Sequence, residues 1–332
     1  MKRTSKLFAY IIVFVLAFSL LCACSGSGAA SGGTGGGTNG IVADTGSDVS
    51  EVVTVPDSSG MFTDADKTPS YDAASAVAIS IDGGAVTADS DTVSALGGKA
   101  TITEPGTYIV SGSGSNVTII VDVPSAITEK VRLVLSGASI VNDDFAAIYI
   151  KSADKTFIVL EGENSLAVTG SFAAIDYNKV DGVIFAKDNV VLQGEGSLTI
   201  TSSKHGIVGK DDVKITGGTI SVTAANHGIE ANDSVRVASA SLTIVSNKNG
   251  IHVENTYDAT KGYFYMESGS LKITSGYEGI DASGAVEITG GTTDITSGDG
   301  SGKTLSSSDI STKGVKSSAD MLISGGEVST TG

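Results

Sequence analysis

The chain has 332 residues, of which 43 are glycine, four are proline and none is tryptophan. It carries 37 acidic side chains against 21 lysines and arginines, a formal net charge of −16. A surface this acidic repels nucleic acid and anionic lipid, so we expect neither as a partner, whereas divalent cations suit it. Small and β-branched residues dominate, and short apolar alternations end at Gly, Asn or Asp, which indicates strands and turns rather than helices.

Residues 1–24 have the pattern of a secretory signal peptide. Three cationic residues precede the apolar run from Leu7 to Leu21, which closes on the sequence LCAC. This ending resembles bacterial lipoprotein signals and implies cleavage before Cys24, a lipid on that cysteine and a location outside the cytoplasm on the cell membrane. A plain signal peptide or an uncleaved amino-terminal anchor is the alternative. No other segment has the length and apolarity of a bilayer span, so the lipid is the only membrane contact that we expect.

Residues 25–70 are predicted to be a spacer. The stretch SGSGAASGGTGGGTNG, from Ser25 to Gly40, has the composition of a flexible tether, and an acidic stretch with few bulky apolar residues continues to Ser70. Strand-length alternation starts near Tyr71, with SAVAISIDGG and then GGKATITEPGTYIVSGSGS. We therefore place the folded body at residues 71–332.

The body returns to one turn at a regular interval. Gly206, Gly228 and Gly250 each precede an isoleucine and are about 22 residues apart, and Gly279 follows about 29 residues later. The apolar residues of these units fall in matching columns: Ile207/Ile229/Ile251/Ile280/Val315, Val213/Val235/Phe264/Val286/Met321, Ile215/Val237/Met266/Ile288/Ile323 and Ile220/Leu242/Leu271/Thr293/Val328. Like residues are thus expected to stack on like.

A period of this length with alternation inside each unit is typical of a solenoid, because one unit cannot bury its apolar row alone. We predict an all-β chain that forms a right-handed parallel β-helix with coils of about 22 residues; the handedness follows from the general crossover rule. A propeller is the rival, but its units are nearer 40 residues. The chain stops at Gly332, midway through a unit, which we interpret as a truncated product or an end covered by a partner.

Two sets of stacked polar positions are candidates for a metal site. One set flanks the buried isoleucine of each unit and is expected to face solvent on one ridge; it includes His205, His227, Glu230, His252, Glu278 and Asp281. The other is a column of Asp188, Asp211 and Asp233, with Asp212 beside it. Stacked carboxylates about 5 Å apart repel one another unless they are protonated or bridged by a cation.

Calcium is the cation that we predict, because Ca²⁺ accepts carboxylate and turn carbonyl oxygens in flexible geometry. Its predicted ligands are the acidic column or the group Glu230, Glu278 and Asp281. Acidic residues that only form turns are the alternative. The stacked pair His205 and His227 could instead hold a metal or act as acid and base, although no carboxylate that would orient them is evident.

The insertion ENTYDATKGYFYM, from Glu254 to Met266, gathers aromatic residues. Phe264 and Met266 are predicted to point inward and the neighbouring tyrosines outward, where tyrosine rings stack on sugars. The predicted carbohydrate-binding residues are Tyr257, Tyr263, Tyr265, Tyr277 and Lys248. Packing of the insertion against its own coil is the alternative.

An ordered set of segments resembles a known family. GTYIVSGSGSNVTIIVD, VRLVLSGASI, AAIYIKSADKTFIVLEGENSL, GVIFAKDNVVLQGEGSLTI and HGIVGKDDVKITGGTISVTAANHGI are similar to the bacterial carbohydrate-binding β-helix lipoproteins whose domain resembles pectate lyases. The resemblance runs from about Ile79 to the end. It implies a calcium-binding β-helix that binds cellulose and polygalacturonate at the cell surface, without established catalysis. Where such domains often have Asp before Gly-Ile, this chain has His205, His227 and Asn249.

Three functions remain open at this point. The first is a monomeric surface lipoprotein that binds plant-type polysaccharide, pectin or cellulose, with calcium bridging protein and glycan carboxylates. The second is a calcium-dependent polysaccharide lyase, in which calcium acidifies a sugar proton and a cation near the acidic column removes it. The candidate bases are Lys187, Lys210, Lys214 and Arg236. The third is an adhesive or structural surface rod without catalysis.

Overall fold

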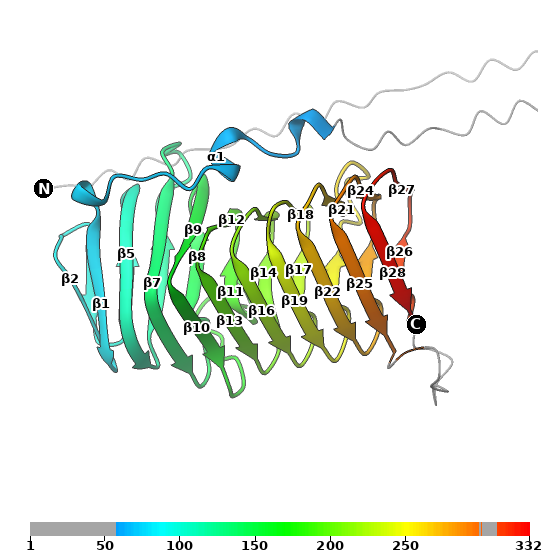
Figure 1. Cartoon of the computed structure of the whole chain (residues 1–332). Coiled ribbons are helices and arrows are strands. Elements are labelled where there is room, and N and C mark those ends of the chain that lie inside the picture. The colour runs from blue at the N-terminus through cyan, green and yellow to red at the C-terminus, as the bar shows by residue number, and fades with distance from the viewer. Residues whose placement is uncertain (1–57, 299, 301–310) are drawn as a thin grey trace, which may run out of the picture. The chain divides into compact units, whose positions relative to one another are not determined.

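The computed structural model describes residues 58–298, 300 and 311–332. The predicted signal peptide, Cys24 and most of the predicted spacer lie outside these residues. The described part is built almost entirely of strands that stack side by side from β1 to β28 (Figure 1). Among the described residues, no helix has the length and apolarity needed to cross a bilayer.

The strands form three faces, because each regular coil contributes one strand to each. Face 1 is a sheet of ten strands, which pair in the order β26-β23-β20-β17-β14-β11-β8-β6-β4-β3. These strands are β3 (Val93–Leu96), β4 (Lys99–Ile102), β6 (Thr118–Asp122), β8 (Ile148–Ser152), β11 (Gly182–Ala186), β14 (His205–Gly209), β17 (Ile229–Ala231), β20 (Ile251–Val253), β23 (Ile280–Ala282) and β26 (Val315–Ser317).

Faces 2 and 3 belong to one sheet of 18 strands that bends between them. Face 2 contains β9 (Lys155–Glu161), β12 (Asn189–Gly194), β15 (Asp212–Ile215), β18 (Ser234–Val237), β21 (Tyr263–Met266), β24 (Val286–Ile288) and β27 (Met321–Ile323). Face 3 contains β10 (Glu163–Val168), β13 (Ser197–Ser202), β16 (Thr219–Ala224), β19 (Ser241–Ser246), β22 (Ser270–Ser275), β25 (Thr292–Ser297) and β28 (Glu327–Thr331). The strands β1 (Val77–Gly83), β5 (Gly106–Ser115) and β7 (Val131–Asn142) join the two faces at the N-terminal end, where β2 (Ala85–Ala88) also lies.

The strands of successive coils pair in parallel. Among the described residues, only the pairs β1–β2 and β3–β4 are antiparallel. Each strand therefore hydrogen-bonds to its equivalent in the next coil, which is the arrangement of a parallel β-helix. The predicted parallel β-helix is thus present.

The predicted apolar columns pair as expected. Ile207 is in register with Ile229, Ile229 with Ile251, Ile251 with Ile280, and Ile280 with Val315. The columns through Val213, Ile215 and Ile220 pair in the same way along faces 2 and 3. Apart from Met321 and Ile323, which are 46% and 49% exposed, their side chains lie in one continuous interior, and fully burying each Val, Ile or Leu stabilises the fold by about 1.5–3 kcal/mol.

An N-terminal segment packs against face 2 before the first coil begins; we call residues 61–75 the strap. It contains α1 (Asp64–Lys67) and η2 (Ala73–Ser75), and η1 (Ser58–Gly60) precedes it. Thr63 and Asp66 form a capping box that starts α1, with Asp66 accepting from the Thr63 backbone N–H at 3.0 Å. Met61 is only 1% exposed and Asp66 is 0% exposed. The packed body therefore begins about ten residues before Tyr71, inside the segment predicted to be a spacer.

Candidate functional site

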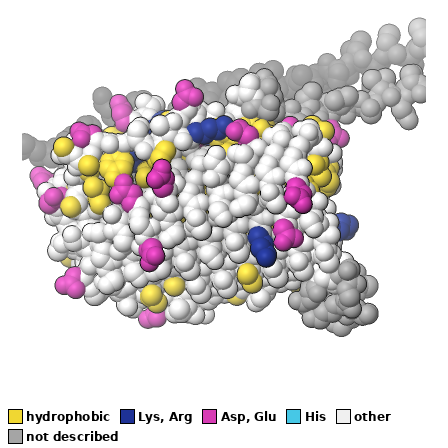
Figure 2. Space-filling model, viewed as in Figure 1, with side chains coloured by type: hydrophobic (Ala, Val, Ile, Leu, Met, Phe, Trp, Pro, Cys, Tyr) yellow, Lys and Arg dark blue, Asp and Glu magenta, His cyan; other side chains and the backbone are white. Residues whose placement is uncertain are grey.

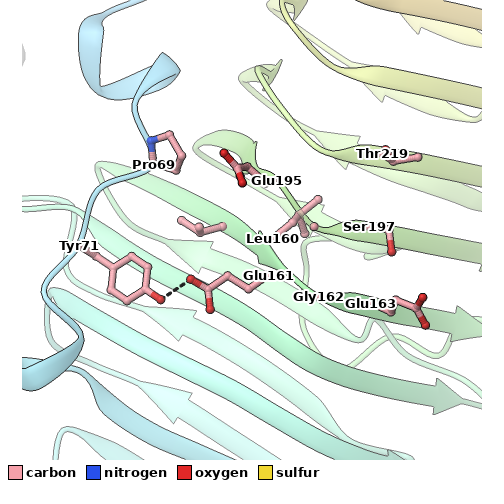
Figure 3. A pocket seen from close by; sticks show the side chains of 12 residues that line it. Pro69, Tyr71, Leu160, Glu161, Gly162, Glu163, Glu195, Ser197 and Thr219 are labelled. Atoms are coloured by element: carbon pink, nitrogen blue, oxygen red, sulfur yellow. Dashed lines mark hydrogen bonds between the residues drawn. The ribbon is translucent and has the colours of Figure 1, made fainter.

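A groove runs between the strap and the turns that connect face 2 to face 3 (Figure 3). This strap groove has a volume of about 600 Å³. Pro69 and Tyr71 line it on the strap side, residues 159–163 and 194–197 on the other, and Thr219 also lines it. A second hollow of about 420 Å³ shares Pro69, Gly194, Glu195 and Thr219 with it and reaches Ser239 and Ser241. The two hollows therefore form one path across several coils.

Tyr71 and Glu161 face one another across the strap groove (Figure 3). The Tyr71 hydroxyl donates to a carboxylate oxygen of Glu161, and this bond, with burial, raises the pKa of Tyr71 to about 12. Glu163 and Glu195 are exposed along the same groove, with Ser197 and Thr219 beside them. An aromatic ring beside carboxylates and hydroxyls offers both the apolar face and the hydrogen-bonding groups that a sugar ring needs.

The turn that carries Glu195 depends on glycine. Gly194 has φ +107°, and a Cβ there would lie 2.5 Å from the Leu160 carbonyl oxygen of the preceding coil. No other residue type adopts this conformation without strain in so little space. The close approach of the two turns places Glu195 next to Glu161 along the groove.

Hydroxyl side chains cover the outer side of face 3 beyond the groove. On β16, Ile220 and Val222 point inward, while Thr219 and Thr223 are exposed. In the view of Figure 2 the surface is mostly neither charged nor apolar, and acidic side chains are scattered singly over it. The strap groove thus opens onto a neutral, hydrogen-bonding surface.

The predicted tyrosines of the insertion do not form one site. Phe264 and Met266 point into the core as predicted, but Tyr263 and Tyr265 are only 8% and 2% exposed. They lie under the strap, where they pack against Met61 and Phe62. Both tyrosines point away from the interior of the coil, as predicted. They are not accessible to a ligand, because the strap covers this side of the sheet.

The other predicted sugar contacts lie away from the strap groove. Tyr257 is fully exposed in the insertion. Tyr277 and Lys248 are half-buried in stacked turns, where the Tyr277 backbone N–H donates to the Lys248 carbonyl at 3.2 Å. Sequence reasoning missed Tyr71, since the segment before it was interpreted as spacer; the Thr63–Asp66 capping box was the signal that could have corrected this.

The strap also covers three cations of face 2. Asp66 pairs with Lys214 at 2.8 Å and with Lys155 at 3.0 Å. The Arg236 guanidinium donates to the Met61 carbonyl and pairs with Asp212, at 2.8 and 3.0 Å. Of the four candidate bases, Lys214 and Arg236 are thus held under the strap, Lys210 pairs with Glu230 at 3.1 Å, and Lys187 is exposed.

Each carboxylate of the predicted acidic column has a partner within the protein. Asp211 and Asp233 share a hydrogen bond, and burial followed by this bond raises the pKa of Asp211 to about 7. Burial opposes ionisation of Asp233, but the hydrogen bond from Asp211 and the ion pair with Lys261 at 2.6 Å outweigh it and lower its pKa. Below about pH 7, protonation of Asp211 therefore relieves the repulsion expected between the stacked carboxylates of Asp211 and Asp233. Asp188 accepts a backbone hydrogen bond from Ala153 at 3.0 Å.

The ridge around the buried isoleucines is less exposed than predicted. His205, Asn249 and Glu278 are only 6%, 4% and 4% exposed, because neighbouring coils stack above and below them. Asp281 pairs with Lys316 at 2.9 Å and lies 3.3 Å from the Nδ1 atom of His252. The expectation that these columns face solvent was therefore wrong for His205, Asn249 and Glu278, whereas His227, Glu230, His252 and Asp281 are half-buried.

The predicted stacking of His205 on His227 is present, and His252 extends it. The ring centroids are 5.2 Å apart for His205 and His227, and 4.8 Å apart for His227 and His252. Burial, with the neighbouring histidines, lowers the pKa of His227 to about 3, and burial also lowers that of His205. Both rings are therefore neutral at pH 7. Among the described residues, the group of His205, His227 and Glu230 brings its ligand atoms within 4.8 Å of one another.

A family model described as "Carbohydrate-binding domain-containing protein" matches residues 96–331. The chain belongs to this family. A curated protein of the same description from Acetivibrio thermocellus (strain ATCC 27405) is 42% identical over 192 residues, which are 56% of this chain and 66% of that relative. The match thus spans just under two thirds of the relative's length.

A solved structure has the same fold as this carbohydrate-binding domain. It is described as the polysaccharide lyase-like protein from C. thermocellum, in a gadolinium derivative, and it is 32% identical to this chain. The comparison has a TM-score of 0.68 and covers 76% of this chain and 99% of the solved one. The family and this neighbour both agree with the resemblance found in the sequence.

Proposed function

We propose that this chain binds polysaccharide in the strap groove, without catalysis, at the outer surface of the cell, where a lipid on Cys24 would hold it. The observation that carries the proposal is the groove of about 600 Å³ in which Tyr71 faces Glu161. The membership in a carbohydrate-binding family supports it.

The extent of the groove suits a polymer. Its lining comes from successive coils, from Glu161 through Glu195 and Thr219 to Ser241. Strands of neighbouring coils are about 4.8 Å apart, so these four positions span roughly 15 Å, the length of a few linked sugars. We also propose that the helix is right-handed with a regular coil of about 22 residues, since parallel crossovers are almost always right-handed.

Acidic polysaccharide of the pectin class, with calcium, is the ligand that we propose over cellulose. Glu161, Glu163 and Glu195 make the groove negative, so a uronate chain needs a cation between itself and the protein. Most of the predicted calcium ligands are already paired with cations, and the described residues hold no three converging carboxylates. We therefore place Ca²⁺ between the groove carboxylates and the uronates, with the glycan supplying part of its oxygen ligands. The neighbour was solved with gadolinium, which is also a hard cation.

The contacts of two candidate bases, Lys214 and Arg236, favour glycan binding without catalysis over lyase activity. Lys214 is 6% exposed and paired with Asp66, and Arg236 is engaged by Asp212 and by Met61. A cation held in this way is not free to take a proton from a sugar in the strap groove. Appearance of unsaturated uronate on incubation of folded protein with polygalacturonate would restore the lyase alternative.

The test is co-sedimentation with insoluble polygalacturonate and with cellulose, with and without a calcium chelator. We expect binding to polygalacturonate that the chelator abolishes. Tyr71→Ala should weaken it by about 1 kcal/mol, roughly fivefold in Kd, whereas Tyr257→Ala in the insertion should leave it unchanged. Loss with Tyr257→Ala alone would move the site to the insertion, and no binding to any glycan by folded protein would refute the proposal.

A further inference from the structure

All three histidines of this chain lie in one stack. The planes of His205 and His227 are inclined by 16°, and those of His227 and His252 by 18°. His205 and His227 precede the glycines of successive coils, and Glu230 follows His227 on the same coil, on β17. Parallel stacking of the coils thus brings two imidazoles and one carboxylate to the same point of face 1.

The spacing of these three groups is close to that of metal ligands. His205 Nδ1 lies 3.4 Å from Glu230 Oε2. Ligands of a tetrahedral zinc ion with bonds of 2.0–2.1 Å are separated by about 3.3 Å, so this pair is already at the required distance. A ligand atom of His227 lies within 4.8 Å of the other two, which a rotation of its ring can shorten.

One of these atoms is buried and has no hydrogen bond. The His205 side chain is 7% exposed, and among the described residues its Nδ1 has no hydrogen-bond partner. Leaving such an atom unsatisfied is unfavourable, and a bound cation would remove this cost. Lys210 holds the other oxygen of Glu230 at 3.1 Å, so the oxygen that faces His205 is the one left for a metal.

The surroundings suit a ligand role for both rings. Asp181 Oδ2 binds Lys204 at 2.7 Å and lies 3.8 Å from the Nε2 atom of His205, so only a closer approach would let it orient the ring as carboxylates do behind many metal-bound histidines. His227 Nδ1 accepts a hydrogen bond of 3.3 Å from the Asn249 backbone N–H. That bond is longer than the usual range, so it holds the lone pair of Nδ1 only weakly.

We propose that His205, His227 and Glu230 form a binding site for a borderline divalent cation of the Zn²⁺ class. Two imidazoles and one carboxylate select such a metal over Ca²⁺, which prefers oxygen ligands. The ion links two successive coils of face 1 and keeps a fourth position for water. The site is separate from the strap groove and does not depend on glycan binding.

The first test is titration of the full chain with Zn²⁺ and, for a visible spectrum, with Co²⁺. We expect one equivalent bound and the absorption bands of tetrahedral cobalt. His227→Gln and Glu230→Gln should each weaken binding roughly tenfold or more. His252→Gln, which removes a stacked ring that is not a ligand, should change it little. Equal binding by His205→Gln, His227→Gln and the unchanged chain would overturn the site, as would a Kd weaker than about 1 mM.

A second measurement avoids variants that could misfold. In ¹⁵N spectra of the imidazoles, only three side chains contribute, since the chain has only three histidines. Zn²⁺ should shift the signals of two rings strongly and the third weakly, and Ca²⁺ should shift none of them. Unshifted signals with excess Zn²⁺ would contradict the proposal.

Discussion

The carboxylate of Asp66 lies 2.8 Å from the ammonium of Lys214, although 148 residues separate them in the sequence. Both side chains are almost fully buried, and a second ammonium, that of Lys155, lies 3.0 Å from the other oxygen of Asp66. One acid of the strap therefore holds two cations of face 2. This relationship fixes the strap beside the groove that we propose to bind polysaccharide.

Asp66→Ala should destabilise the protein strongly. It leaves Lys214 and Lys155 without their counter-charge in a buried place, and removal of one partner of a buried pair costs about 3–5 kcal/mol. The free energy of unfolding in urea measures this. Asp64→Ala removes an exposed acid of the same helix and is the control. Equal losses in both variants would show that the ion pairs contribute nothing specific.

The same contact predicts a loss of stability in acid. Burial opposes ionisation of Asp66, but the hydrogen bonds from Lys214, Thr63 and Lys155 outweigh it and lower its pKa from 3.8 to about 2. The stability that this provides is present above pH 3.8 and is lost as the pH falls through about 2. Asp66→Asn should therefore reduce the dependence of stability on pH between about 4 and 2. If the free energy of unfolding depended on pH in the same way in Asp66→Asn and in the unchanged chain, Asp66 would not have this role.

Asp211→Asn should stabilise the protein at neutral pH. The raised pKa of Asp211, about 7, means that between pH 3.8 and 7 the folded state keeps a proton that the unfolded state has released, so stability falls as the pH rises through this window. Asparagine can donate to Asp233 without this loss. The variant should gain stability relative to the unchanged chain from about pH 4 to 7, in thermal unfolding at a series of pH values. Asp82→Asn, at an exposed position of β1, should show no such trend.

Gly228→Ala should lower the free energy of unfolding, although the backbone of Gly228 does not have a positive φ. A Cβ at this position would lie 2.3 Å from the Cγ2 atom of Ile244 and 2.7 Å from the Gly250 carbonyl oxygen. Overpacking of this kind costs about 1–3 kcal/mol or more. Gly84→Ala is the matched control, since the nearest atom there would be 3.9 Å away. A similar midpoint of urea unfolding for both variants would show that the coil can relax around the added methyl group.

Calcium by itself should raise the thermal midpoint very little. The carboxylates predicted as its ligands are already paired, as Asp212 is with Arg236 and Asp281 is with Lys316. In the presence of polygalacturonate, calcium should raise the midpoint, because ligand binding to the folded state stabilises it. A large shift with calcium alone, reversed by chelator, would instead indicate a site made by the protein.

The repeat determined the fold because, in a parallel β-helix, equivalent side chains stack directly on one another. Ile207, Ile229 and Ile251 occur at equal spacing in the chain and lie in register in the structure for the same reason. The stacking of His205 on His227 follows from the same spacing. Alternation along the strand also placed Phe264 inside and Tyr265 outside the coil.

Only the tertiary structure decided which outward side chains are accessible. Lys214, Arg236 and Tyr265 alternate outward on face 2 as solvent-facing residues would, but the strap, far away in the sequence, covers them. The repeat contains no information about a segment outside it, so neither the burial of these residues nor the groove at Tyr71 could be predicted from the period. The burial of the histidines has a similar origin, since it depends on the side chains of the coils above and below.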